Sequence, residues 1–294
     1  MTNPVPPKRL FSPAAEEAKT AQPTTFSPQT QDSAYRLAFQ DMDFLLRQDL
    51  RPVRFQLELL KPELLLDEAG IESTFVIYGS ARIPEPSKAD ALIQTAATEH
   101  QRLIAERLKA KSKYYEEARR LARIASRVGP TADGKRQFVV CSGGGPSIME
   151  AANRGAVDEG KESIGLNIVL PHEQLPNPFV TPSLSFQFHY FSLRKMHFLI
   201  RARAVAVFPG GFGTFDECFE LLTLIQTGKI KPLPVILFGR EFWERVIDFQ
   251  ALVDEGTVSP NDLDLFKFVE TAEEAWDYVW QFYESSSEML SSAK

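Results

Sequence analysis

The chain has little cysteine and little histidine, with two and four of these among its 294 residues. Two cysteines, Cys141 and Cys218, cannot form the disulfide framework of a small secreted domain, and each lies beside a glycine loop on a stretch typical of a buried element. We expect both to be small core residues. The histidines are scattered, and no Cys/His cluster has metal-ligand spacing. The sequence therefore predicts no metal site and no cofactor.

The chain also lacks a long apolar run. No stretch reaches membrane-spanning length, and the first residues lack the apolar segment of a signal peptide. The net charge is −6, which disfavours a nucleic-acid backbone as a partner. We expect a cytoplasmic protein without membrane or nucleic-acid partners. With 44% hydrophobic residues, the chain is long enough for one large α/β core.

Three apolar stretches that end in small residues or glycines are the most informative part of the sequence. They are 74–78 followed by Gly79-Ser80-Ala81-Arg82, 137–140 followed by Cys141-Ser142-Gly143-Gly144-Gly145, and 204–207 followed by Phe208-Pro209-Gly210-Gly211-Phe212-Gly213-Thr214. Short apolar runs of this kind are typical of buried parallel strands. In an open parallel sheet all the carboxyl ends lie along one edge, where ligands bind.

A strand that ends in glycines and continues as a helix presents backbone N–H groups to an anion, and the helix N-terminus adds positive charge. We expect Thr214 to cap the helix that follows and to offer its hydroxyl. Glu217 lies one turn further, where the helix dipole favours the ionised carboxylate. No loop continues as a Walker A sequence or fits G-x-G-x-x-G cleanly. The pattern predicts a mononucleotide phosphate rather than NAD, and a tight turn without a ligand is the alternative.

The residues 209–217, Pro-Gly-Gly-Phe-Gly-Thr-Phe-Asp-Glu, resemble the PGGxGTxxE signature of the LOG ("Lonely guy") family. Arg194-Lys195 stands at the family's spacing before that signature, and 142–156 and 78–82 resemble its other two strand ends. The resemblance covers about residues 50 to 280 and is closest to the longer bacterial members. LOG enzymes are nucleoside 5′-monophosphate phosphoribohydrolases that were long described as lysine decarboxylases.

The resemblance implies a hydrolase that cleaves AMP or an N6-substituted cytokinin riboside 5′-monophosphate to free base and ribose 5-phosphate. It assigns the catalytic pair to Arg194 and Glu217. The substrate-binding residues that we expect are Ser80, Gly144, Gly145, Glu173, Lys195, Gly210, Gly211, Gly213, Thr214 and Thr223. The chemistry fits, because an oxocarbenium-like ribose needs a nearby carboxylate and a fork-shaped guanidinium suits phosphate or ribose oxygens.

Alternatives remain for these residues. Glu217 could merely stabilise its own helix, and Arg194 could form a surface ion pair, as we expect of Arg201 and Arg203. Lys195 could suggest a pyridoxal Schiff base, but no Asp is evident for the pyridine nitrogen. A non-catalytic nucleotide-binding or carrier protein of the same fold is the second function class. The presence of both Arg194 and Glu217 favours the hydrolase, because binding alone needs only the glycine loops.

The alternation of strands and helices predicts an α/β, Rossmann-like fold, with a doubly wound, mostly parallel sheet and helices on both faces, over residues 71–285. The strands expected after the first are 137–142, 163–170, 184–189, 204–208 and 233–238, and the helices are 147–159, 192–203, 214–227 and 241–255. Residues 88–127 are expected to form one or two helices, of which 88–112 is an insertion.

The two ends of the chain lie outside this domain. Residues 1–31 are expected to be a disordered tail, 32–70 a helical extension with helices over 33–50 and after Arg51-Pro52, and 286–294 a flexible end. The extension packs on the sheet edge or forms a dimer. Apolar residues cover more than one stripe of 192–203, which predicts a homo-oligomer, at least a dimer.

Overall fold

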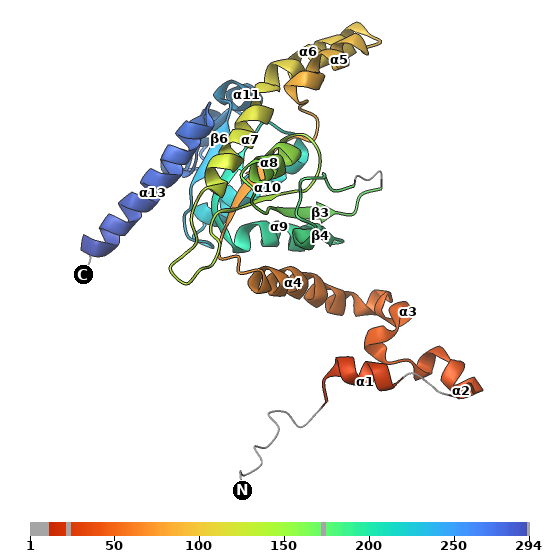
Figure 1. Cartoon of the computed structure of the whole chain (residues 1–294). Coiled ribbons are helices and arrows are strands. Elements are labelled where there is room, and N and C mark those ends of the chain that lie inside the picture. Colours follow the sequence, from red (N-terminus) through yellow and green to blue (C-terminus); the bar gives the residue numbers. More distant parts are fainter. Residues whose placement is uncertain (1–11, 22–24, 172–174, 293–294) are drawn as a thin grey trace. The chain divides into compact units, whose positions relative to one another are not determined.

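The structure is a computed structural model that describes residues 12–21, 25–171 and 175–292, with side chains described up to residue 285. The chain divides into two compact units, Met1–Glu58 and Leu59–Lys294 (Figure 1). The second unit contains the α/β domain and all residues of the site described below. Among the described residues, no helix is long and apolar enough to cross a membrane.

A seven-stranded sheet forms the centre of the second unit, and every pair of neighbouring strands is parallel. The strands are β1 (Thr74–Tyr78), β2 (Val139–Ser142), β3 (Ile164–Ile168), β4 (Ser185–Phe188), β5 (Ala202–Val207), β6 (Val235–Phe238) and β7 (Lys267–Val269). Their spatial order is β4-β3-β2-β1-β5-β6-β7, so the direction of winding reverses at β1. The predicted doubly wound α/β fold is confirmed.

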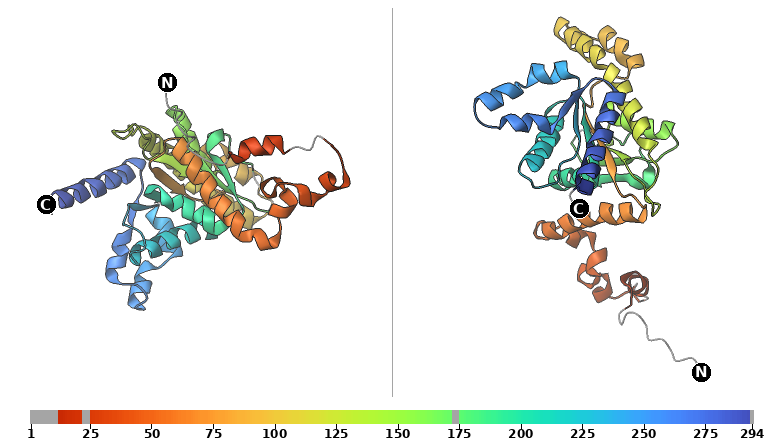
Figure 2. Two further views of the ribbon diagram at one scale, coloured as in Figure 1. Left: turned by 90° about the horizontal axis from the view of Figure 1, so that it is seen from below. Right: turned by 90° about the vertical axis from the view of Figure 1, so that its left-hand side faces the viewer.

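Helices cover both faces of this sheet (Figure 2). The helices of the second unit after β1 are α5 (Pro86–Gln94), α6 (Glu99–Lys111), α7 (Lys113–Ser126), α8 (Ile148–Asp158), α9 (Phe191–Ile200), α10 (Phe212–Gln226), α11 (Arg240–Val246), α12 (Phe249–Asp254) and α13 (Ala272–Ser292). On one face, apolar side chains of α7, α8 and α13 form a core with Phe75 and Ile77 of β1. Because side chains alternate along a strand, Tyr78 points to the other face of the sheet. There the centre of its ring lies 5.0 Å from the centre of the Phe198 ring of α9.

Close packing of α7 against α8 depends on a glycine. A Cβ at Gly155 would lie 2.2 Å from the carbonyl oxygen of Arg119. The two helices can therefore approach closely enough to bury an alanine-rich contact, which includes Ala122 and Ala152. Both cysteines are free and buried, which confirms that Cys141 and Cys218 are core residues.

Several predicted helices differ from the observed ones in the second unit. Residues 88–127 form three helices rather than one or two, and α5 and α6 make a hairpin that extends away from the sheet (Figure 1). The helix expected over 241–255 is two helices, because Asp248 caps α12 by accepting a hydrogen bond from Ala251 N at 3.0 Å. Strand β7 was not expected from the sequence. The boundary expected at 285 falls inside α13.

The first unit consists mainly of short turns of helix. They are α1 (Ala14–Thr20), α2 (Pro28–Gln31), η1 (Ser33–Tyr35), η2 (Ala38–Gln40), α3 (Met42–Leu45) and η3 (Gln48–Leu50), followed by α4 (Arg51–Glu68), which ends in the second unit. The continuous helix expected over 33–50 is wrong, because the carboxylates of Asp32 and Asp41 accept from backbone N–H groups and start separate turns. The helix expected after Arg51-Pro52 is confirmed as α4. The disorder of 1–31 stays a prediction.

Candidate active site

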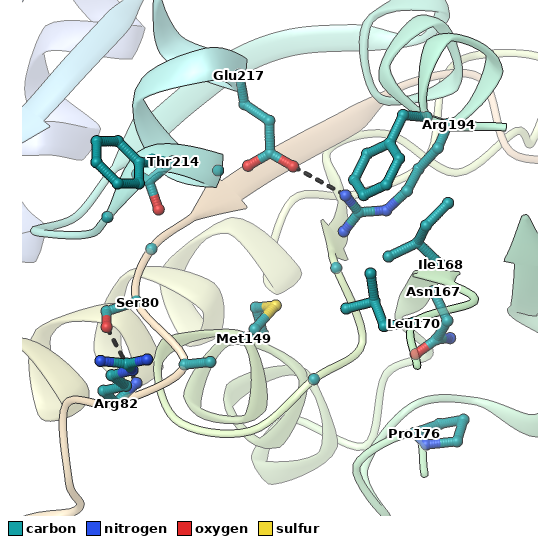
Figure 3. A pocket seen from close by; sticks show the side chains of 18 of the residues that line it. Ser80, Arg82, Met149, Asn167, Ile168, Leu170, Pro176, Arg194, Thr214 and Glu217 are labelled. Atoms are coloured by element: carbon teal, nitrogen blue, oxygen red, sulfur yellow. Dashed lines mark hydrogen bonds and ion pairs between the residues drawn. The ribbon is translucent and has the colours of Figure 1, made fainter. Parts of the chain in front are cut away.

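A cleft with a volume of about 1010 Å³ lies at the carboxyl ends of the central strands (Figure 3). Strand β1 lies between β2 and β5, so the three small-residue strand ends meet at one edge of the sheet, as the sequence predicts. Five of the residues predicted to bind substrate line the cleft together with both predicted catalytic residues. They are Ser80, Gly145, Gly211, Gly213 and Thr214, with Arg194 and Glu217.

The loop between β5 and α10 exposes the N-terminus of a 15-residue helix to this cleft. The first intrahelical hydrogen bond runs from Phe215 N to Gly211 O at 3.0 Å, so the preceding N–H groups have no acceptor within the helix. No atom lies within 4 Å of where a Cβ would be at Gly211 or Gly213. A ligand can therefore approach this backbone closely.

Thr214 does not cap α10, contrary to our prediction. The helix begins two residues earlier than expected, with Gly211 at the N-cap position. Thr214 is buried, and its hydroxyl lies against Gly210, where a Cβ would be 2.1 Å from Thr214 Oγ1. Gly210 itself does not line the cleft, and its role is to make room for the Thr214 side chain, which does.

The second glycine loop, after β2, is shaped by two residues with positive φ. Gly144 has φ +71°, and a Cβ there would lie 2.5 Å from Asn167 Oδ1, so both conformation and space require glycine. Ser147 has φ +66°, and its hydroxyl donates to the carbonyl of Ile83. A Cβ at Gly143 would lie 2.7 Å from Arg194 Nη2. The loop is thus packed directly against the guanidinium of Arg194.

Ser80, at the end of β1, connects the two glycine loops. Its N–H donates to Pro209 O at 3.1 Å, and its carbonyl accepts from Ile148 N at 3.4 Å. Its hydroxyl accepts from Arg82 N at 3.0 Å. Ser80 and the exposed Arg82 both line the cleft (Figure 3).

Arg194, on the first turn of α9, is buried and held by three contacts. Its Nε donates to Leu166 O at 2.7 Å, and its Nη1 donates to Glu217 Oε1 at 3.1 Å. Its guanidinium lies 4.9 Å from the centre of the Phe198 ring. These contacts fix the orientation of the guanidinium at the cleft wall, so the surface ion pair considered above is not its environment. Arg201 does form an ion pair, with Glu63 and Asp67 of α4.

The carboxyl group of Glu217 has a strongly perturbed acidity. Burial raises the pKa of Glu217 to about 7; the charge of Arg194 opposes this rise, while that of Asp216 adds to it. Burial, and then the charge of Glu217, also raises the pKa of Tyr78. A perturbed carboxyl group with a specific charged partner in a cleft is characteristic of functional sites.

Lys195 and Thr223 point away from the residues that surround the cleft. Lys195 Nζ lies 3.0 Å from Asp216 Oδ1 and 3.2 Å from Glu220 Oε2. Burial lowers the pKa of Lys195, but these two carboxylates outweigh it and the pKa is raised overall. The Thr223 hydroxyl donates to Phe219 O at 2.7 Å. Glu173 lies outside the described residues, and the roles expected of these three residues stay predictions.

Some cleft residues were missed from the sequence. They include Arg82, Met149, Asn167, Gln187 and Phe212. Phe212, which occupies the variable position of the PGGxGTxxE pattern, is 95% exposed. Asn167 could have been noticed, because it is a polar residue within the apolar stretch 164–168.

Part of the chain is similar to known proteins. Residues 149–279 match the family model described as "Possible lysine decarboxylase". A pyrimidine/purine nucleotide 5′-monophosphate nucleosidase of Escherichia coli K12 is 31% identical over 144 residues, which are 46% of this chain and 30% of that protein. A cytokinin riboside 5′-monophosphate phosphoribohydrolase of Arabidopsis thaliana is 30% identical over 125 residues, which are 41% of this chain and 57% of that protein.

These matches leave much of each curated relative uncovered, since the chain spans less than two thirds of either one. Among solved structures, a molybdenum cofactor carrier protein from Chlamydomonas reinhardtii is 16% identical, with a TM-score of 0.41, covering 72% of this chain and 99% of that chain. The matched segment 149–279 contains both members of the Arg194–Glu217 pair.

Proposed function

Because residues 149–279 belong to the LOG family, matched as "Possible lysine decarboxylase", we propose that this chain is a nucleoside 5′-monophosphate phosphoribohydrolase. It hydrolyses the N-glycosidic bond of AMP or an N6-substituted cytokinin riboside 5′-monophosphate, and it releases the free base and ribose 5-phosphate. The names of the two curated relatives support this reaction type. The observation that carries the proposal is the buried Arg194–Glu217 pair beside the N-terminus of α10.

The phosphate binds at the N-terminus of α10 in this proposal. The first turn of the helix offers N–H groups without intrahelical acceptors, and Gly211 and Gly213 leave the approach open. The Thr214 hydroxyl lines the same part of the cleft and adds a donor. A phosphomonoester dianion is the ligand chemistry that such a turn favours.

Glu217 acts at C1′ of the ribose. As the bond between C1′ and the base nitrogen breaks, positive charge develops on the ribose ring, and a carboxylate stabilises it. The C1′–nitrogen bond breaks with its electron pair on the base, and the oxygen of a water molecule forms the new bond to C1′. The proton of that water passes to Glu217, which returns it to the base nitrogen. A pKa of about 7 suits a group that accepts and returns a proton near neutral pH.

Arg194 orients Glu217 and contributes a permanent positive charge. Nη1 is committed to Glu217 and Nε to Leu166 O. Nη2 lies close to Gly143 at the cleft wall. That nitrogen is the part of the fork that we assign to a ribose or phosphate oxygen of the substrate.

A decarboxylase that forms a Schiff base is disfavoured by the state of Lys195. Schiff-base formation needs a neutral amine, whereas the two carboxylates beside Lys195 raise its pKa. The remaining alternative is a protein that binds nucleotides without turnover. Such a protein would need the glycine loops but not a buried carboxyl group poised at C1′.

We also propose that the active unit is a homo-oligomer, at least a dimer, located in the cytoplasm. Met196 and Ile200 lie one turn apart on α9, and they are 49% and 39% exposed. Phe198 of the same helix is buried in its own domain. The apolar stripe through Met196 and Ile200 is therefore available to a second copy of the chain.

The reaction is tested by incubating the purified protein with AMP and following adenine and ribose 5-phosphate by chromatography. Stoichiometric release of both products, with repeated turnover, is the expected result. A protein that binds AMP at equilibrium and releases no adenine would support the carrier alternative instead.

A further inference from the structure

Asn167 is a half-buried carboxamide on β3 whose orientation is fixed by its neighbours. Its Nδ2 donates to Phe186 O at 3.2 Å and to Ser185 Oγ at 3.4 Å, both on the adjacent strand β4, and lies 3.5 Å from Gly165 O. Carbonyl oxygens only accept hydrogen bonds, so the nitrogen and not the oxygen must face them. The pairing of β3 with β4 therefore determines which end of the amide faces the cleft.

The end that faces the cleft is the acceptor, Oδ1. The carboxamide packs against Gly144, where a Cβ would lie 2.5 Å from Oδ1 and 2.8 Å from Nδ2, and Figure 3 draws Oδ1 on the side of Asn167 nearer Met149. Among the described residues, no donor is within hydrogen-bond distance of Oδ1, although Asn167 lines the cleft (Figure 3). An acceptor with a fixed direction and an unused lone pair requires a donor from a ligand or from water.

Three apolar side chains of the cleft lie near Asn167. In Figure 3, Ile168, Leu170 and Pro176 lie with Asn167 on one side, and Thr214 and Ser80 lie on the other. Glu217 lies between the two groups in that view. The polar and apolar parts of a nucleotide are arranged in the same order. Its phosphate is charged, its ribose lies in the middle, and its flat base is largely apolar with few polar atoms on its edge.

We propose that Asn167 determines which bases the site accepts, by taking a hydrogen bond from an exocyclic amino group. Adenine, N6-monosubstituted adenine and cytosine carry such an N–H. Hypoxanthine, guanine and uracil place a carbonyl oxygen at the same position, and two acceptors repel each other. This inference rests on the proposed function only in taking a nucleoside 5′-monophosphate as the ligand.

Equilibrium binding to the unmodified protein gives the first test. The probes are AMP, purine riboside 5′-monophosphate, which has no group at position 6, and inosine 5′-monophosphate. We expect AMP to bind about tenfold or more tightly than the inosine nucleotide, with the unsubstituted purine between them. Equal affinities for the three would overturn the proposal. Because binding is measured, the outcome does not depend on turnover, and a failure of the hydrolase proposal is recognised separately.

The second test uses Asn167→Leu, which removes the acceptor and keeps a side chain branched at the same atom. The preference for AMP over the inosine nucleotide should shrink to within about threefold, while the affinity for ribose 5-phosphate, which has no base, stays the same. Gln137→Leu, which replaces a half-buried carboxamide outside the cleft, is the matched control and should retain the preference. A folded Asn167→Leu protein that keeps the preference would contradict the proposal. If that variant does not fold, the wild-type series decides alone.

Discussion

Arg194 Nη1 lies 3.1 Å from Glu217 Oε1, and the pair joins the first turn of α9 to the second turn of α10 at the cleft. Neither residue is near the other in sequence, and both are largely buried. Burial favours the neutral form of the carboxyl group, while the guanidinium favours the charged form. The carboxyl group is therefore held near the midpoint of its titration at neutral pH.

Replacing Glu217 with Gln should abolish most of the turnover and leave AMP binding nearly unchanged. The negative charge acts on a cation that is present mainly in the transition state, so kcat should fall by about 10²- to 10⁴-fold while Kd changes by no more than about threefold. Steady-state kinetics and calorimetry measure the two quantities. Asp216→Asn is the control, because Asp216 is the adjacent but more exposed acid, and it should retain most of the activity. Near-normal turnover in Glu217→Gln would exclude it from catalysis.

The rate should increase with pH until Glu217 is ionised. Its pKa is raised to about 7, so the ionised fraction, and with it log kcat, should increase up to about pH 7 and level off above it. A pH–rate profile at saturating AMP measures this. The phosphate of AMP also titrates near pH 6, and its effect is identified from the pH dependence of inhibition by ribose 5-phosphate. A flat profile between pH 5 and 8 would show that another group is rate-determining.

The raised pKa of Glu217 also affects the pH dependence of stability. The direction is opposite to that of an ordinary salt-bridged carboxylate, whose pKa is lowered on folding. The pKa of Glu217 is raised from 4.5 to about 7 on folding, so between these values the folded state binds more protons than the unfolded state. The free energy of unfolding therefore decreases as pH increases through this window, by at most about 3 kcal/mol. Glu217→Gln lacks this dependence, so its Tm relative to wild type should be higher at pH 8 than at pH 5. Parallel melting curves of the two proteins would disprove the raised pKa.

Removing the phosphate from the substrate should nearly abolish the reaction. Adenosine cannot satisfy the N–H groups at the start of α10, so kcat/KM for adenosine should be about 10³-fold or more below that for AMP. Base release from both substrates, measured at several concentrations, gives the ratio. Comparable values for the two would contradict the assignment of the Gly211–Thr214 loop to the phosphate.

The chain should associate through the apolar stripe of α9. Light scattering should give at least twice the 33.1 kDa of one chain, and Met196→Glu should reduce the mass to that of one chain. Val157→Glu, at a residue of α8 that is 47% exposed, is the matched control and should leave the mass unchanged. A fully active wild-type sample with the mass of a single chain would refute the assembly.

The parts of the site that are local in sequence could be predicted, and those that depend on strand pairing could not. The glycine loops and Glu217 follow apolar strands directly, so their position at the sheet edge was evident. Thr214 was misassigned as a cap because helix start signals do not distinguish Gly211 from a threonine three residues later. Asn167 stands out in the sequence as a polar residue in an apolar stretch, but its orientation could not be predicted, because it depends on Ser185 and Phe186, which only the β3–β4 register places beside it.

The backbone of Ser80 is hydrogen-bonded on one side to Pro209 and on the other to Ile148. Pro209 precedes one glycine loop and Ile148 follows the other. Each loop is therefore hydrogen-bonded to Ser80, and opening either loop breaks a bond to this shared residue. The loops therefore form one unit of local unfolding, and their amide protons should exchange with solvent at a common rate. A ligand that contacts only the N-terminus of α10 should therefore slow exchange in both loops, including the amide of Ile148 at the start of α8.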